Sequence, residues 1–275
     1  MLLSQWHPRQ FLAALRAIDE EISIGDRPRA SRKVAIVLAT MALCLLGIHY
    51  LKYASVFDGL LRDVSLQLDQ TLGAYSQLRA SPWFNLQTQA WWAFWHLLGY
   101  VLVPVLVIRL VLKERLSAYG IGWGETTHYL PYYLALALPI VFFAFLASFR
   151  EDFANHYPFY PLASRSLVDL LLWELLYIAQ FVALEFFFRG FVLHACKPSM
   201  GSAAVFVMCV PYLMIHFPKP WLEATGAIPF GILLGVLALR SRSIWGGAAV
   251  HVTIALSMDI LALAQGNRLP VRWLP

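Results

Sequence analysis

The chain has 275 residues, of which 60% are hydrophobic and 13% are charged, and its mean hydropathy is +0.63. This composition excludes an ordinary water-soluble globular domain and indicates an integral membrane protein. The formal net charge of +5 comes mostly from Lys and Arg at the ends of apolar segments, where they meet lipid headgroups, so no nucleic-acid partner is expected.

The first 32 residues precede any long apolar stretch and include Pro8, Arg9 and the acidic run DEE at 19–21. A cleavable signal peptide has an apolar stretch close to its start, so this composition argues against one. We predict that residues 1–32 form a cytoplasmic N-terminal tail, part of it an amphipathic helix on the membrane surface.

Seven apolar segments are candidates for membrane-spanning helices, each of which needs roughly 20 mainly apolar residues. Glycine and proline interrupt these segments without strict alternation of polar and apolar residues, which favours helices over the strands of an outer-membrane barrel. The candidates cover residues 33–52, 88–112, 128–149, 167–194, 202–217, 224–240 and 244–264. The expected fold class is an all-α polytopic transmembrane helical bundle, with about seven to eight membrane helices in a single integral membrane domain over residues 1–275.

Residues 56–78, between the first two candidates, place Leu, Val and Tyr at helical spacing beside acidic and basic side chains such as Asp58 and Arg62. A helix with one apolar and one charged face lies on a membrane and does not cross it. We therefore predict an amphipathic surface helix over this stretch.

The distribution of Lys and Arg indicates the orientation of the chain, because cytoplasmic loops carry an excess of them. With a cytoplasmic N-terminus, the inner segments carry Arg9, Arg16, Arg27, Arg29, Arg32, Lys33, Arg109, Lys113, Arg115, Arg189, Lys197, Arg240 and Arg242. The outer segments carry Lys52, Arg62, Arg79, Arg150, Arg165, Lys219, Arg268 and Arg272. Thirteen against eight predicts a multi-pass protein of the cell (inner) membrane with its N-terminus inside and its C-terminus outside.

Ionisable residues within spanning segments are costly and tend to face a bundle interior or a watery cavity, so they are candidate site residues. In the fourth candidate helix, Glu185 and Arg189 are i and i+4 and can form an ion pair on one face. Glu174 lies eleven residues earlier, which is almost three turns, on nearly the same face. The plainer alternative is that Glu185 and Arg189 only neutralise each other near a helix end.

Two histidines lie in later candidate helices. Tyr212 and His216 are i and i+4 near the end of the fifth candidate, and His251 lies early in the seventh, with Asp259 further along. An interfacial His216 and a buried His251 bound to a backbone carbonyl are the ordinary alternatives. Together with Glu185, however, they suffice for hydrolysis, because a carboxylate and an imidazole can deprotonate water while a second histidine stabilises an oxyanion.

Four segments, in chain order, resemble the motifs of the CPBP intramembrane proteases, the family of CAAX prenyl endopeptidases and of bacteriocin-processing and self-immunity proteins. The segments are LEFFFRG at 184–190, YLMIH at 212–216, PFGILLGVLALRSRSIW at 229–245 and AAVHVTIA at 248–255. The family pattern is EExxxRG, then FxxxH, then a Gly-rich helix, then HxxxN or HxxxD. The resemblance covers residues 167–264, which we expect to be a protease-like core.

The resemblance implies a glutamate-dependent endopeptidase, often labelled a metalloprotease, that cleaves a membrane-associated protein within a chamber in the lipid bilayer. By position, Glu185 matches the second Glu of the first motif and Arg189 its arginine. His216 matches the histidine of the second motif, in which Tyr212 replaces Phe. The resemblance implies that the first Glu of the pair activates water and that His251 stabilises the oxyanion. For this chain we predict water activation by Glu185 and His216.

Two positions depart from the family pattern. Leu184 replaces the first Glu, and Ala255 replaces the Asn or Asp four residues after His251. Either the site is rearranged, with Glu185 as the base, or the protein is a catalytically inactive member that serves as a membrane scaffold or immunity partner. In a rearranged site the candidates for supporting roles are Glu174, Tyr212, Glu223 and Asp259.

Two histidines and Glu185 are compatible with a catalytic zinc ion but do not require one, because HExxH spacing is absent and the same groups activate water without metal. The three cysteines lack CxxC spacing and predict neither a disulfide framework nor a thiolate metal site. A transporter is a third alternative, against which stands the lack of a repeat between the halves of the chain. The sequence specifies neither the substrate nor the oligomeric state.

Overall fold

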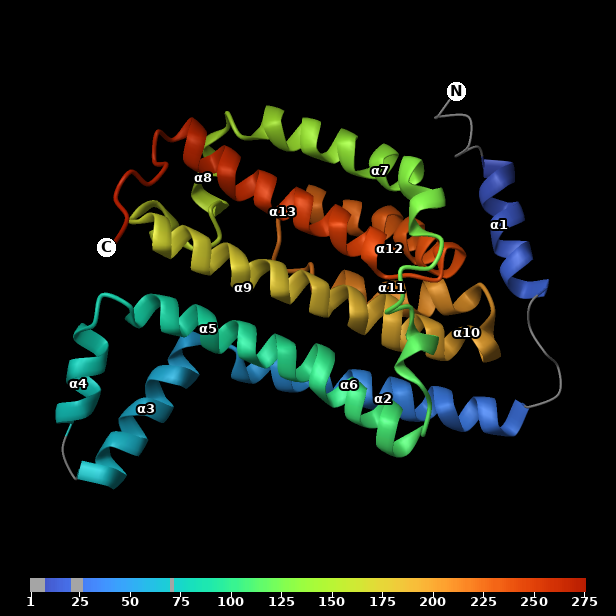
Figure 1. Cartoon of the computed structure of the whole chain (residues 1–275), viewed down its shortest axis with the longest axis horizontal. Coiled ribbons are helices and arrows are strands. Elements are labelled where there is room, and N and C mark those ends of the chain that lie inside the picture. The colour runs from blue at the N-terminus through green and yellow to red at the C-terminus, as the bar shows by residue number, and fades with distance from the viewer. Residues whose placement is uncertain (1–7, 21–26, 70–71) are drawn as a thin grey trace. The chain divides into compact units, whose positions relative to one another are not determined.

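The structure is a computed structural model that describes residues 8–20, 27–69 and 72–275. Its regular elements are all helices, and none of the described residues lies in a strand, which confirms the all-α class (Figure 1). The parts of the predicted N-terminal tail at residues 1–7 and 21–26 lie outside the described residues.

The α-helices are α1 (Pro8–Glu20), α2 (Arg27–Leu51), α3 (Ala54–Asp69), α4 (Gly73–Ala80), α5 (Phe84–Leu97), α6 (Val103–Leu106), α7 (Thr126–Ala147), α8 (Glu151–His156), α9 (Leu167–Glu185), α10 (His194–Met200), α11 (Ala203–Met214), α12 (Trp221–Ser241) and α13 (Trp245–Gln265). Three π-helical stretches continue the long helices, namely η3 (Leu98–Leu102), η4 (Val107–Val111) and η7 (Phe186–Leu193). Two short 3-10 helices are η5 (Leu116–Tyr119) and η6 (Pro161–Ser164).

Six helical stretches of the described chain are long and apolar enough to cross a membrane, which confirms a polytopic bundle. They are Arg32–Leu51, Phe84–Val111, Thr126–Ala147, Leu167–Met200, Trp221–Ser241 and Trp245–Gln265. Each coincides with one of the seven predicted segments. The remaining predicted segment corresponds to α11, which is apolar but has only 12 residues.

Helix α11 ends at Met214, three residues before the predicted end of its segment. Pro218 and Pro220 lack the backbone N–H that a continuing helix needs, and the residue before a proline is disfavoured in helical conformation. The chain therefore turns at residues 215–220 before α12 begins. His216 lies in this turn, outside the helices that are long enough to span.

The single amphipathic helix predicted over residues 56–78 is in fact two helices, α3 and α4, and residues 70–71 between them lie outside the description. The phenol of Tyr75 donates to Asp58, and Arg79 forms an ion pair with the same carboxylate. Since Asp58 belongs to α3 and both partners to α4, these contacts hold the two helices against each other. The sequence pattern was right about amphipathic helix and wrong about its continuity.

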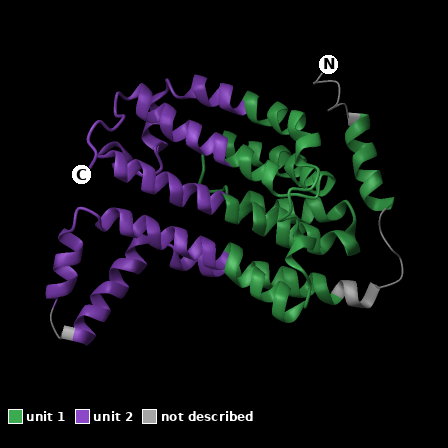
Figure 2. Ribbon diagram, in the orientation of Figure 1, with its two compact units in different colours: residues 1–44, 100–139, 182–251 green, residues 45–99, 140–181, 252–275 purple. Residues whose placement is uncertain are grey.

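Contacts between residues divide the chain into two compact units, coloured green and purple in Figure 2. Unit 1 comprises residues 1–44, 100–139 and 182–251, and unit 2 comprises residues 45–99, 140–181 and 252–275. A single domain over residues 1–275 stays a prediction.

Unit 2 has an aromatic core around Trp173. The ring of Trp173 stacks on Phe159 at 5.8 Å and on Tyr177 at 4.8 Å between centroids. Its indole N–H donates to Asp259 Oδ2 at 2.8 Å, and the backbone N–H of Phe159 donates to Oδ1 at 3.1 Å. Both oxygens of the buried Asp259 are thereby hydrogen-bonded, so this carboxylate helps to hold the core together.

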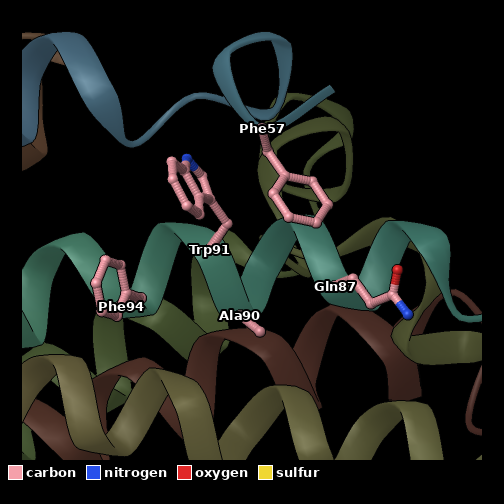
Figure 3. A pocket seen from close by; sticks show the side chains of 5 residues that line it. All are labelled: Phe57, Gln87, Ala90, Trp91 and Phe94. Atoms are coloured by element: carbon pink, nitrogen blue, oxygen red, sulfur yellow. The ribbon is translucent and has the colours of Figure 1, made fainter. Parts of the chain in front are cut away.

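A shallow hollow of about 390 Å³ also lies in unit 2, between α3 and α5. Its lining is Phe57, Gln87, Ala90, Trp91 and Phe94 (Figure 3). The lining carries no charged side chain, and Gln87 is its only polar one. It offers no group for hydrolytic chemistry.

At one end of unit 1, α2 and the turn between α12 and α13 contact the segment at residues 114–125. Lys33 of α2 pairs with Glu114 at 2.8 Å, and the phenol of Tyr119 donates to the same carboxylate at 2.6 Å. The adjacent Gly120 carbonyl accepts from the backbone N–H of Ile244, and Glu125 N–H donates to the Ser241 carbonyl. The turn between α12 and α13 therefore lies at the same end of unit 1 as the start of α2.

Candidate active site

Glu185 and Arg189 lie where α9 passes into the π-helical stretch η7, and both side chains are fully buried in unit 1. A guanidinium nitrogen of Arg189 is 3.0 Å from Glu185 Oε1. The predicted i, i+4 ion pair is therefore present. π-helical turns within α-helices are frequent at functional sites, so the local geometry adds a reason to look here.

His251 of α13 is a second partner of Glu185. Its Nδ1 lies 2.6 Å from Glu185 Oε1, a short hydrogen bond between two buried groups. Gly247, one turn earlier on α13, lies against the other carboxyl oxygen, and a Cβ at that position would overlap Glu185 Oε2. The absence of a side chain at Gly247 thus lets α13 approach the carboxylate closely enough for His251 to reach it.

Tyr212 of α11 binds the other nitrogen of the same imidazole. Its hydroxyl lies 2.9 Å from His251 Nε2, and the Arg189 guanidinium carbon lies 4.1 Å from the centroid of its ring. Glu185, His251, Tyr212 and Arg189 therefore form a closed ring of four contacts, which we call the buried tetrad. Its members come from three helical stretches: α9 with its continuation η7, α11 and α13.

The ion pair fixes the direction of the hydrogen bonds in the buried tetrad. Glu185 is ionised beside Arg189, so its oxygen accepts and His251 Nδ1 carries the hydrogen. In the neutral imidazole Nε2 then has a lone pair, which accepts the hydroxyl hydrogen of Tyr212. This carboxylate, imidazole and hydroxyl sequence is the arrangement that activates a hydroxyl in hydrolases.

His216 lies against Tyr212, with 4.6 Å between the ring centroids. Its Nδ1 is 2.8 Å from the Tyr212 carbonyl oxygen, so Nδ1 carries the hydrogen and Nε2 keeps a lone pair. Burial is the main cause that lowers the pKa of His216 to about 4. The side chain is therefore a neutral imidazole at pH 7, and its Nε2 makes no hydrogen bond within the described residues.

The other predicted residues lie outside the buried tetrad. Glu223 lies in the first turn of α12 and pairs at 3.4 Å with Lys219, which lines a surface hollow of about 430 Å³. Asp259 and Glu174 belong to unit 2, where Asp259 is bonded as described above. Both carboxyl oxygens of Glu174 are buried without a hydrogen-bond partner among the described residues. A catalytic part for these three stays a prediction.

The two departures from the family pattern are both buried and apolar. Leu184 is 4% exposed in unit 1, and Ala255 is 4% exposed in the aromatic core of unit 2. Neither position supplies a donor or an acceptor. If the site acts, its polar groups must come from elsewhere, and Tyr212 is the polar side chain that the structure adds to Glu185 and His251.

Sequence reasoning missed the contact between α12 and Tyr212. Gly231 of α12 packs against the ring of Tyr212, where a Cβ would lie 2.8 Å from Cδ1. It also missed Tyr133 of α7, whose hydroxyl is 3.0 Å from Ser241 Oγ. The Gly-rich motif at 229–245 was a signal for the first, but nothing in the sequence pairs Tyr133 with Ser241.

The predicted donor set does not converge on a point where a metal ion could bind. Within residues 8–20, 27–69 and 72–275, no group of three or more His, Cys, Asp or Glu side chains could hold one. The reason is visible in the tetrad: His251 Nδ1 faces Glu185, and its Nε2 faces Tyr212. Zinc therefore does not fit these residues as they are arranged, and no reaction step is assigned to it.

A family model described as type II CAAX prenyl endopeptidase Rce1-like matches residues 166–257. The matched stretch contains all four residues of the buried tetrad together with His216. Comparison with curated proteins and with solved structures finds no match. The resemblance predicted from the motifs is confirmed over residues 166–257, where the chain matches the Rce1-like type II CAAX prenyl endopeptidases, a family of proteases.

Proposed function

We propose that the protein is an intramembrane endopeptidase that hydrolyses a peptide bond of a membrane-associated protein. The observation that carries the proposal is the buried contact of 2.6 Å between Glu185 and His251. A carboxylate that holds an imidazole by its Nδ1–H leaves Nε2 as a base and stabilises the imidazolium that forms. The match to a protease family supports the same chemistry.

In the proposed reaction, the pair formed by Glu185 and His251 receives a proton from water, while His216 Nε2 accepts a hydrogen bond from the second water hydrogen. The water oxygen bonds to the carbonyl carbon of the substrate, and the π electrons move onto the carbonyl oxygen. Protonated His251 then stabilises this oxyanion by its positive charge, which is the role predicted for it. As the C–N bond breaks, the same proton passes to the leaving amine.

Arg189 keeps Glu185 in the ionised form that this scheme requires. Isolated charges are expensive in a low-dielectric interior, and a buried carboxylate without a partner would take up a proton. The contact of 3.0 Å and the ring of Tyr212 under the guanidinium offset that cost for both charges. Arg189 is therefore proposed as the residue that keeps Glu185 ionised, without contact to substrate.

The substrate proposed is a protein whose scissile segment reaches into the lipid bilayer. Glu185, Arg189 and His251 lie on helical stretches long and apolar enough to cross a membrane. A peptide bond has to leave water to meet them. The proposed partners are therefore a membrane-associated protein substrate and the bilayer itself.

The test compares membranes from cells with and without the protein. We expect new protein amino termini that depend on its presence, and we expect Glu185→Ala, His216→Ala and His251→Ala each to lower their rate of appearance by about 10²-fold or more. Exposed His128 of α7 provides a matched control, because His128→Ala removes an imidazole outside the site. If all three variants process the substrate as the parent does, the proposal is wrong.

A second candidate, a catalytically inactive membrane scaffold or immunity partner, is favoured by the apolar Leu184 and Ala255. In that case, membranes with and without the protein contain the same protein amino termini. The biological effect would survive His251→Ala and fail when Gly190 or Gly247 is enlarged, because both glycines are close-packed. The two candidates therefore predict opposite results for His251→Ala.

A further inference from the structure

The reactive nitrogen of His251 is covered by a side chain that the family pattern does not contain. The resembled motif has Phe where this chain has Tyr212, and the added hydroxyl lies 2.9 Å from His251 Nε2. An imidazole nitrogen has one in-plane lone pair, so a water molecule cannot bind Nε2 while the hydroxyl does. This point rests on the proposed function and concerns how a proton reaches His251.

The ring of Tyr212 is packed among three neighbours. Arg189 covers one face, Gly231 packs against the ring without a side chain between them, and Phe188 meets it edge-on at 5.5 Å. The residue is 1% exposed. Because the phenol oxygen moves only with its ring, the hydroxyl is a permanent part of the site and not a group that swings aside for water.

We propose that the Tyr212 hydroxyl is a catalytic proton relay between the attacking water and His251. Water donates its hydrogen to the phenol oxygen as the phenol hydrogen moves to His251 Nε2. The water oxygen bonds to the carbonyl carbon at the same time, so one proton leaves water and one arrives on His251. In the second half of the reaction, His251 returns the proton to Tyr212, which gives its own hydrogen to the leaving amine.

The surroundings of Tyr212 suit this task. The positive charge of Arg189 over the ring stabilises negative charge that develops on the phenol oxygen. The ring centroid of His216 lies 4.6 Å from that of Tyr212, so a second imidazole packs against the relay residue. The only exposed edge of the carboxylate and imidazole pair belongs to His251, whose side chain is 9% exposed against 0% for Glu185. Water therefore reaches this pair at His251 and not at Glu185.

The relay also explains how the chain could act without the first Glu of the pattern. Leu184 has no proton-accepting group. A hydroxyl at residue 212 extends the reach of the base at His251 by one hydrogen bond. The hydroxyl of Tyr212 thus supplies part of the proton-accepting capacity that is lost with Leu184 in place of Glu.

The test is Tyr212→Phe, which keeps the ring that packs on Arg189 and Gly231 and removes one oxygen atom. Solubilised membranes of cells lacking the protein serve as the substrate, and the purified protein in proteoliposomes is added. We expect the new amino termini to appear about 10²-fold more slowly with Tyr212→Phe than with the parent, at an unchanged thermal midpoint of the protein. We also expect a smaller rate difference between H₂O and D₂O, since fewer protons move in the limiting step.

Tyr133→Phe is the matched control, because it removes another buried phenol oxygen of unit 1, bonded to Ser241 Oγ and outside the tetrad. It should process at the parental rate. Parental or faster processing by Tyr212→Phe would overturn the relay and leave the protease assignment standing. An intact protein that releases no new termini would overturn the protease assignment, and the relay with it.

Discussion

Two opposite charges are buried completely within unit 1. Glu185 and Arg189 have 0% exposed side chains, and the desolvation of each charge costs several kcal/mol before any contact is made. A pair of this kind contributes little net stability compared with apolar side chains of the same size. Its presence therefore points to a task that needs a charge in that place, and holding His251 by its Nδ1–H is such a task.

The pH dependence of the reaction offers a test at the same scale. Burial lowers the pKa of His216 to about 4, with a further lowering by His251 and Lys219 and an opposing effect of Glu223. The imidazole is thus neutral throughout pH 5–8. For an ordinary histidine with a pKa of about 6.5, the neutral fraction falls about thirtyfold from pH 8 to pH 5. We expect His216→Gln to slow processing by the same factor at every pH from 5 to 8.

The measurement is the ratio of the rates of parent and His216→Gln in buffers of constant ionic strength. The ratio should change only below pH 5, where the parental imidazole begins to be protonated. A ratio that falls steeply between pH 7 and pH 6 would mean that His216 titrates as an exposed histidine does. His128→Gln, at an exposed position of α7, should leave the ratio at one.

At the scale of elements, the site depends on how closely α13 approaches η7. Gly246 and Gly247 are both tight: a Cβ at the first would lie against the ring of Tyr133, and a Cβ at the second would overlap Glu185 Oε2. Small residues permit such approach between membrane helices, where packing and hydrogen bonds replace the hydrophobic effect as the source of association. The two glycines therefore set the distance between His251 and its carboxylate.

Gly247→Ala should lengthen or break the contact between His251 and Glu185. The added methyl group has to displace the carboxylate or the helix, and overpacking of this kind typically costs about 1–3 kcal/mol. We expect a lower thermal midpoint and a rate of processing reduced by about 10²-fold, since a shift near 1 Å is enough to misalign catalytic groups.

Gly226→Ala is the control for Gly247→Ala. It also lies in a helix of unit 1, α12, but a Cβ there meets nothing within 4 Å. It should keep the parental midpoint and rate. Equal thermal midpoints and rates for Gly247→Ala and Gly226→Ala would show that α13 does not pack closely against η7 in the membrane.

The sequence was sufficient to predict the elements but not all their ends. Apolar length alone identified the six long helices, because a membrane span is dictated by composition over roughly 20 residues. It placed the end of α11 three residues too late, since Pro218 and Pro220 act before their own positions. The break between α3 and α4 was missed because the apolar spacing carries on through it.

The candidate site was predicted in part for a similar reason. Motif spacing identified Glu185, Arg189, His216 and His251, and the structure joins three of them in one cluster. Which nitrogen of His251 faces Glu185, and that Tyr212 occupies the other, depends on contacts between residues 39 and 66 positions apart in the chain. Such pairings are set by helix packing, which periodicity within one helix does not reveal.

At the scale of the whole molecule, contacts within unit 1 bear on how the chain crosses the membrane. Lys33 at the start of α2, Glu114, and the turn between α12 and α13 lie at one end of that unit. Helix α11 and the turn after it thus leave this end, and α12 returns to it. Arg240 and Arg242 then lie at the same end of unit 1 as Lys33, and a cytoplasmic location of this end stays a prediction from the distribution of basic residues.

This arrangement predicts that the chain ends on the side opposite to the turn at Arg242. Helix α13 leaves that turn and is 21 residues long, about 31 Å, enough to cross the hydrocarbon core once. In intact cells, a membrane-impermeant maleimide should label Arg268→Cys, and it should label Arg242→Cys only after the membrane is opened. The three natural cysteines are buried, so the unmodified protein provides a low background. Labelling of both variants from the same side would mean that α13 does not cross the membrane and that His251 does not lie within it.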